Sequence, residues 1–373
     1  MKIRDLDLSS PYALAPMAGM TDSAFRRLVK RQGGCGLVVT EMVSSDGLVR
    51  GIDRTLEYAE YTEDERPVSI QIFGGDPGKM AAAAQIVESL GADIVDVNMG
   101  CPVPKISRHN AGCSLMREPQ HAAKVVEAMA TAVKIPVTVK MRAGWNDAEI
   151  TAPTLAKLVE DAGASAIAVH GRTAAQSYAG SSDWDLIAAV AARVGIPVFG
   201  SGDCIEPEQI VARMASGAVS GVLVGRGVLR NPWILRQAEQ LAAGVPVRAT
   251  PLAERGQFLI EYIELLLHER MGETEGFRHT AGTTVPESRP GEPARGRDRW
   301  VINKVRALCS WYSKGLEAGS QLRVAVNTAT SIQQLREIVA HFFFAAAREE
   351  FLAGTHADCE TPSKTLAGKS CQL

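Results

Sequence analysis

The stretch Ile94-Val95-Asp96-Val97-Asn98-Met99-Gly100-Cys101-Pro102 runs from a strand pattern into a tight turn that carries one thiol. Residues 94 to 97 are mostly β-branched and apolar, which is typical of a strand covered on both faces, as in a parallel sheet. Gly100 and Pro102 end such a strand and restrict the turn around Cys101. Taken alone, Cys101 fits a packing residue as well as a catalytic one, because free cysteine is often buried.

Similar short runs alternate with helical patterns over about the first 230 residues, as expected of a βα repeat. Strands are predicted at 12–15, 37–40, 68–72, 94–97, 137–141, 166–170, 197–200 and 221–225. Helices are predicted at 77–90, 119–133, 153–162, 185–194 and 207–216. Eight strands alternating with helices predict an α/β fold of the (β/α)₈ TIM barrel type, with a doubly wound open sheet as the alternative.

Strand patterns stop after Trp233, and helices are predicted at 252–270, 299–315 and 331–347. Residues 272–298 are rich in Gly, Pro, Thr, Glu and Arg, which predicts a mobile insert. The tail 354–373 has the composition of a disordered segment. We therefore expect a barrel domain at 1–245 followed by a small all-helical domain at 250–347.

Composition limits the function classes. The chain has 373 residues, 46% hydrophobic content and a formal charge of −2, so any basic surface for nucleic acid would have to be local. The seven cysteines form no C-x-x-C pair or metal-ligand spacing, which indicates reduced thiols and no metal site. We find no apolar signal core or membrane-length run, and expect a cytoplasmic protein without a membrane partner.

Unusual polar and glycine residues follow the predicted strands, where the active site of a barrel is assembled. Individually each has an ordinary interpretation: Lys140 could reach solvent and His170 could be a satisfied core histidine. Their repetition at one end of the barrel predicts a functional site. Its candidate members are Pro16, Met17, Ala18, Gln71, Asn98, Cys101, Lys140, His170, Ser201, Gly202, Asp203, Gly225 and Arg226.

The last two strand ends indicate a phosphate-bearing ligand, because Ser201-Gly202-Asp203 and Gly225-Arg226 supply approachable backbone amides and a guanidinium. The amide of Gln71 can both donate a hydrogen bond to the edge of a heterocycle and accept one from it. A cation at Lys140 can stabilise the negative charge of a reduced flavin. Flavin mononucleotide (FMN) satisfies both requirements. No G-x-G-x-x-G follows the first strand, so a Rossmann dinucleotide site is not expected.

The chain resembles the tRNA-dihydrouridine synthases along the whole predicted barrel. The resemblance rests on Leu14–Asp22, Thr40–Met42, Gln71–Gly74, Asp96–Pro102, Val139–Arg142, Val169–Thr173, Gly200–Asp203 and Gly225–Gly227. It implies a flavin-binding barrel, a helical domain that helps to grip tRNA, and reduction of the C5=C6 bond of selected uridines with electrons from NADPH. We also expect a monomer.

The same resemblance implies residue roles. The FMN site would comprise Pro16, Met17, Ala18, Gln71, Lys140, His170, Ser201, Gly202, Asp203, Gly225 and Arg226. Cys101 would be the proton donor and Asn98 would orient the uracil. Ser201 stands where the family usually has asparagine, a change that flavin binding should survive.

A basic stretch in the second half of the chain is a candidate for contacts with tRNA phosphates. A solvated loop is the equal alternative. Its members are Arg278, Arg289, Arg295, Arg297, Arg299, Lys304 and Arg306.

Three other functions stay open at this point. A flavin barrel acting on a free pyrimidine would use the same chemistry, although the helical extension after residue 250 argues against it. An aldolase-like lyase would use Lys140 as a Schiff-base amine. A catalytically silent RNA-binding scaffold would have no use for the polar strand ends.

Overall fold

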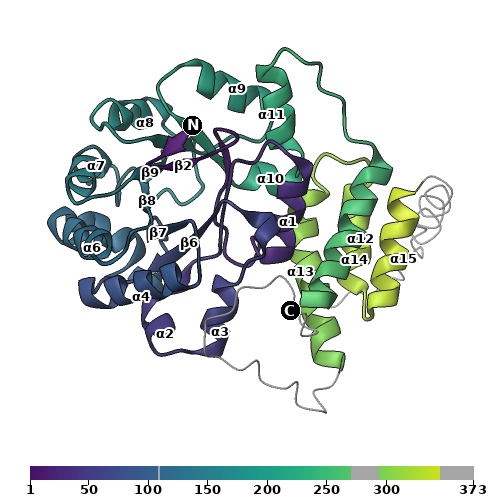
Figure 1. Cartoon of the computed structure of the whole chain (residues 1–373). Coiled ribbons are helices and arrows are strands. Elements are labelled where there is room, and N and C mark those ends of the chain that lie inside the picture. Colours follow the sequence, from purple (N-terminus) through teal and green to yellow (C-terminus); the bar gives the residue numbers. More distant parts are fainter. Residues whose placement is uncertain (108–109, 270–293, 345–373) are drawn as a thin grey trace, which may run out of the picture.

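The computed structural model describes residues 1–107, 110–269 and 294–344, which form a parallel barrel with helices around it and further helices beside it (Figure 1). The barrel strands are β3 (Tyr12–Leu14), β4 (Leu37–Val39), β6 (Val68–Phe73), β7 (Ile94–Met99), β8 (Val137–Arg142), β9 (Ala166–His170), β10 (Val198–Ser201) and β11 (Gly221–Val224). A short strand, β5 (Val43–Ser44), pairs with the end of β6.

The barrel closes because its last strand pairs with its first. Val222 of β11 is in register with Tyr12 of β3, and β4 pairs with both β3 and β6, all in parallel. Closure confirms the predicted (β/α)₈ barrel and excludes the open sheet. All eight predicted strands are present, and their β-branched side chains are buried as expected of strands covered on both faces.

The predicted helices between the strands are confirmed to within a few residues: α4 (Pro77–Ser89), α6 (Pro119–Ala132), α7 (Ala152–Asp161), α8 (Trp184–Ala191) and α9 (Pro207–Ala215). Several helices were not predicted: α1 (Ser23–Gln32), α2 (Ser45–Val49), α3 (Asp53–Leu56), α5 (Pro104–Ser107), α10 (Arg226–Arg230) and α11 (Ile234–Ala242). The longest of those beside the first strands, α1, starts at an N-cap, where Asp22 Oδ1 accepts from Phe25 N at 3.0 Å.

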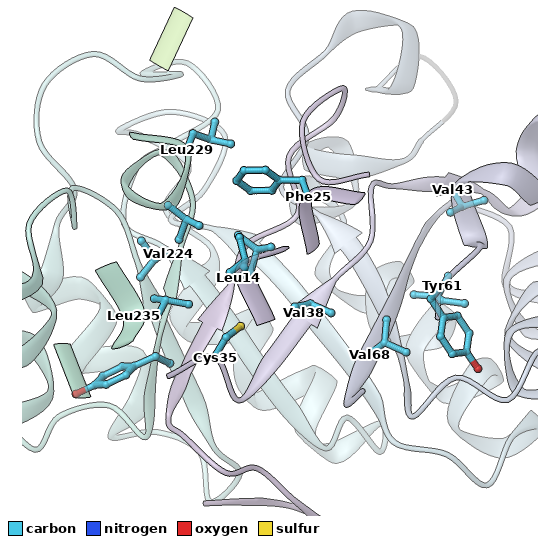
Figure 2. Close-up of a cluster of buried hydrophobic side chains, with 14 of the residues drawn as sticks. Leu14, Phe25, Cys35, Val38, Val43, Tyr61, Val68, Val224, Leu229 and Leu235 are labelled. Carbon is cyan, nitrogen blue, oxygen red and sulfur yellow. The ribbon is translucent and has the colours of Figure 1, made fainter. Parts of the chain in front are cut away.

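Two apolar layers position the site. Outside the strands, Leu14, Val38, Val68 and Val224 lie in the core shared with the helices, as Figure 2 shows. Inside the barrel, the hairpin of β1 (Lys2–Ile3) and β2 (Leu6–Asp7) contributes Ile3 to a cluster that includes Leu37 and Phe199. The hairpin residues therefore help to fill the barrel interior, while the loops that follow the strands surround its carboxyl end.

Within the described part of the chain, four helices follow the barrel: α12 (Leu252–Glu269), α13 (Ala294–Tyr312), α14 (Gly319–Thr328), which was not predicted, and α15 (Ile332–Phe343). They lie beside α1 in Figure 1, and Phe258 of α12 stacks on Tyr312 of α13 with ring centroids 5.7 Å apart.

The predicted insert is shorter than expected at its C-terminal end. Because α13 begins at Ala294, the prediction that the insert extends to residue 298 is wrong. Arg297 donates to the Leu267 carbonyl and so connects the start of α13 to α12. The rest of the insert, 272–293, and the tail 354–373 lie outside the described residues. The division into domains at 1–245 and 250–347 stays a prediction.

Candidate active site

Three neighbouring strands place a buried hydrogen-bonded chain at the carboxyl end of the barrel. Gln71 of β6 donates through Nε2 to Asp96 Oδ2 of β7 at 2.7 Å, and Asn98 Nδ2 donates to Gln71 Oε1 at 2.7 Å. Thr138 of β8 donates to the other carboxylate oxygen of Asp96 at 2.6 Å. These bonds determine which end of the Gln71 amide faces each neighbour.

The chain continues into the turn that carries Cys101. Asn98 Oδ1 accepts from the backbone N–H of Gly100 at 3.1 Å and of Cys101 at 2.9 Å, and Arg142 Nε donates to the Gly100 carbonyl at 2.9 Å. Burial raises the pKa of the Cys101 thiol, although Arg142 and Lys140 oppose the shift. The turn therefore holds a half-buried thiol that keeps its proton at neutral pH.

Lys140 lies on β8 beside this chain. Burial, together with the nearby Arg142 charge, lowers the pKa of its ammonium to about 8. Among the described residues, its Nζ has no hydrogen-bond or ion-pair partner. Asp96 attracts the ammonium from beyond ion-pair distance. A desolvated cation without a direct polar contact among the described residues is suited to an anionic ligand, and it is the feature of the site that best fits a flavin.

We expect the Lys140→Met variant of the ligand-free protein to be more stable than the parent at pH 7 by up to about 3 kcal/mol. The folded lysine loses its proton near pH 8 but the unfolded one only near 10.5, so the unfolded chain binds more protons between these values. The parent therefore gains stability over this window and the difference should vanish above it. Urea unfolding at pH 7, 9 and 11 measures this, with the exposed Lys79→Met as control, and a pH-independent difference would contradict the prediction.

A charged cluster joins the ends of β9, β10 and β11. Asp203 accepts from Arg172 Nη2 at 2.8 Å, from Ser182 N at 2.7 Å and from Arg226 Nη2 at 3.3 Å. The bond from Ser182 and the two guanidiniums outweigh burial and lower the pKa of Asp203. One carboxylate between two guanidiniums leaves net positive charge at this side of the mouth.

His170, at the end of β9, is neutral. Burial lowers its pKa to about 2, with further contributions from Lys140 and the surrounding arginines. Its Nε2 lies 3.4 Å from Arg172 Nη1, so the imidazole occupies the space between Lys140's strand and the Asp203 cluster. A neutral imidazole can bond a ligand but adds no charge to the site.

Small residues bring the loops close together. Gly202 has φ +127°, and a Cβ there would lie 2.3 Å from Ser182 Oγ. A Cβ on Gly225 would lie 3.3 Å from Met17 Sδ, so the ends of the first and last strands are in near contact. The loop with Pro16, Met17 and Ala18 is fixed by Thr21, whose Oγ1 accepts from Met17 N at 3.0 Å. Ser201 is buried and in register with His170.

All the candidate residues from the sequence thus lie on strand ends or following loops of one barrel face. Asp96, Arg142 and Arg172 were not assigned roles from the sequence, although each supports an assigned neighbour. A charged residue inside an apolar strand was the available signal for Asp96. Within the described ranges, no group of three or more His, Cys, Asp or Glu could hold a metal ion, and no helix is long and apolar enough to cross a membrane.

Two side chains of the basic stretch contact other parts of the protein, although the sequence made them candidates for contacts with tRNA phosphates. Arg306 donates to the carbonyls of Val326, Asn327 and Ala329 at the end of α14, and Lys304 pairs with Asp22 and Glu41. The side chains of Arg306 and Lys304 therefore bond to acceptors of the protein itself. Arg299 is exposed. Arg278 and Arg289 lie outside the described residues, as does the side chain of Arg295.

Comparisons with known proteins show the family of the chain. Residues 13–285 match the family model described as dihydrouridine synthase (Dus). A probable tRNA-dihydrouridine synthase of Rickettsia conorii is 38% identical over 345 residues, which are 92% of this chain and 96% of that protein. The tRNA-dihydrouridine synthase B of Pseudomonas aeruginosa is 40% identical over 279 residues, 74% of this chain and 83% of that protein.

Among solved structures, morphinone reductase in complex with tetrahydroNAD matches with a TM-score of 0.48 and 14% identity, covering 65% of this chain and 90% of that one. This likeness is too weak to carry an argument. The family model and the relatives cover the barrel and its strand-end residues, and on them the chain belongs to the dihydrouridine synthase family.

Proposed function

We propose that this protein reduces the C5=C6 bond of specific uridines in tRNA to 5,6-dihydrouridine, with FMN as its bound cofactor and NADPH as the electron donor. The observation that carries the proposal is the placement of the half-buried Cys101, whose backbone N–H donates to Asn98 Oδ1 at 2.9 Å, in the same strand-end site as Lys140. The Lys140 ammonium has no hydrogen-bond or ion-pair partner among the described residues, and burial raises the pKa of the Cys101 thiol. Membership of the family supports it. The cytoplasm, where tRNA and reduced thiols occur together, is the proposed location, and a monomer stays a prediction.

The residues of the site fit FMN. Arg226, with the close backbone of Gly202 and Gly225, would hold the phosphate at the ends of β10 and β11. Asp203 would keep Arg226 in place through the 3.3 Å ion pair. The ring system would meet Gln71, Lys140 and His170, with Pro16, Met17, Ala18 and Ser201 alongside. When bound, FMN reduced by NADPH supplies the hydride that uracil receives at C6.

Cys101 would supply the proton that completes the reduction. Addition of hydride at C6 leaves negative charge on the uracil, and the thiol transfers its proton to C5, so that one hydride and one proton are added in total. Because burial raises its pKa, the thiol is protonated when the base arrives. We propose that Asn98 orients the uracil: its Nδ2 contacts Met42 Sδ at 3.7 Å, a weak acceptor that a uracil carbonyl could replace.

The surface around the site supports a large substrate. Most of the exposed large apolar side chains among the described residues lie in the connections that follow the strands, which include short helices: Val49, Ile52, Tyr58, Val103, Ile150, Tyr178 and Ile205. Exposed apolar side chains beside a polar site are typical of an interaction surface. A target base must leave its stack to reach such a pocket, as base-modifying enzymes require.

The test uses the purified full-length protein with NADPH and unmodified tRNA. We expect a yellow protein with flavin absorbance that forms dihydrouridine in tRNA, detected by mass spectrometry of the digested RNA. Free uridine and uracil serve as parallel substrates. Reduction of these at the rate seen with tRNA would favour the free-pyrimidine reductase, and a colourless protein trapped by borohydride with a carbonyl compound would favour the lyase.

A further inference from the structure

Lys304 of α13 reaches out of the helical region to the first loop of the barrel. Its Nζ lies 3.0 Å from Asp22 Oδ2, 3.2 Å from the Gly19 carbonyl oxygen and 3.4 Å from Glu41 Oε1. The side chain is only 15% exposed. Three acceptors for three ammonium protons make this a complete binding site for one lysine, built by residues more than 260 positions away in the sequence.

The loop that Lys304 holds is the one proposed to contact FMN. Gly19 follows Pro16, Met17 and Ala18, and its peptide groups are fixed on both sides: the N–H donates to Glu41 Oε2 at 2.6 Å and the carbonyl accepts from Lys304. Gly19 has φ +79°, a conformation that L side chains rarely adopt. Glu41 thus connects Lys304 to the Gly19 N–H as well.

A second contact ties the same loop to α12. Tyr262 donates its hydroxyl to Asp22 Oδ2 at 2.9 Å, while Asp22 Oδ1 caps α1. The ring of Tyr262 packs edge-on against Phe25 of α1 with centroids 6.2 Å apart. The loop from Met17 to Asp22 is therefore held by both α12 and α13.

The opposite charges at this contact stabilise one another in a nearly buried position. Asp22 and Glu41 are nearly buried, with side-chain exposures of 11% and 7%. Lys304 is the cation that pairs with both. Its pKa is raised because attraction to Asp22 and Glu41 outweighs the opposing effect of burial. Removal of the ammonium would leave two neighbouring carboxylates without their counter-ion and would free the Gly19 carbonyl.

We propose that Lys304 is a positioning residue that fixes the Met17–Asp22 loop for flavin and so links FMN affinity to the seating of the helical region on the barrel. The inference rests on the proposed flavin site. Coupling of this kind is reciprocal: a helix that holds the loop in its binding conformation strengthens FMN binding, and bound FMN strengthens the contact between the helix and the loop. If these helices help to grip tRNA, as the family resemblance implies, a change in their position would alter the cofactor site through one side chain.

The experiment compares FMN affinity in full-length variants by quenching of flavin fluorescence after removal and titration of the cofactor. Lys304→Met is expected to weaken FMN binding about tenfold or more, and Lys304→Arg to recover part of it, because charge-assisted hydrogen bonds to the loop are lost and partly restored. The matched control is Arg306→Met, two residues along the same helix: it loses contacts to α14 but touches no part of the loop. It should lower the melting temperature and leave FMN affinity unchanged.

Hydrogen exchange gives the reciprocal measurement. FMN should slow amide exchange in α13 of the parent protein and of Arg306→Met, but not of Lys304→Met. If Lys304→Met does not fold, Glu41→Gln replaces it with the same expectation, since it keeps the shape and removes the charge between Lys304 and Gly19. Unchanged FMN affinity in a folded Lys304→Met protein would overturn the inference alone, whereas a parent protein that binds no FMN would overturn the proposed function.

Discussion

Cys101→Ala is expected to lower the rate of uridine reduction in tRNA by a factor of about 10² to 10⁴, the usual contribution of a positioned general acid. Flavin content should stay near one per chain, because the thiol has no role in the proposed cofactor contacts. Single-turnover kinetics would locate the loss: reduction of the flavin by NADPH proceeds normally, and its reoxidation by tRNA becomes slow.

The matched control is Cys113→Ala. Cys113 is fully buried and its backbone N–H donates to the Cys101 carbonyl at 3.0 Å, so its thiol is near the site but not open to a substrate. This variant should keep most of the activity. Normal tRNA turnover by a folded Cys101→Ala protein would remove Cys101 from the mechanism while leaving the flavin site intact.

Arg26→Met is expected to lower the free energy of unfolding by about 3 to 5 kcal/mol, the range for loss of one partner from a buried ion pair. Arg26 and Glu65 are 2% and 0% exposed, and Arg26 Nε lies 2.5 Å from Glu65 Oε2. The guanidinium also donates to the carbonyls of Thr21 and Glu60, both at 2.7 Å. The variant would leave Glu65 Oε2 and the two carbonyls without the donor that Arg26 supplies, and the buried carboxylate without its cation.

The neighbouring Arg27 provides the control for this prediction. Arg27 lies on the same helix and pairs with Asp64 at 3.3 Å, but the side chain of Asp64 is 40% exposed. Arg27→Met should cost no more than about 1 kcal/mol, as is usual for surface pairs. Chemical denaturation of both variants measures the difference, and equal losses would show that burial does not decide the value of the Arg26 pair.

The barrel was predictable because its strands repeat one physical signature. Strands such as Ile94–Met99 are covered on both faces and consist mainly of apolar residues, and polar or glycine residues follow at or beyond the point where each strand reaches the mouth. Parallel strands all end at the same face, so the strand order alone gathers Gln71, Lys140 and His170 into one site. The residue roles assigned within that site stay predictions until they are measured.

Helix α1 escaped prediction for a reason that its structure explains. Its buried face includes Arg26 among Phe25, Leu28 and Val29, so a charged residue interrupts the apolar pattern. The partner that makes this burial possible, Glu65, lies 39 residues further along the chain. Local periodicity carries no information about such a partner.

The sequence by itself determined the strand-and-helix alternation and the face at which the polar residues meet, since each follows from local burial and from the direction of parallel strands. Closure of the predicted barrel, by contrast, was decided by the pairing of β11 with β3 in the structure. Only the tertiary structure decided which charges pair. Lys304 was a candidate for phosphate contact from its basic neighbours, yet it is held by Asp22 and Glu41. The physical reason is that an ion pair depends on the distance between two side chains in space, and folding brings these together from opposite ends of the chain.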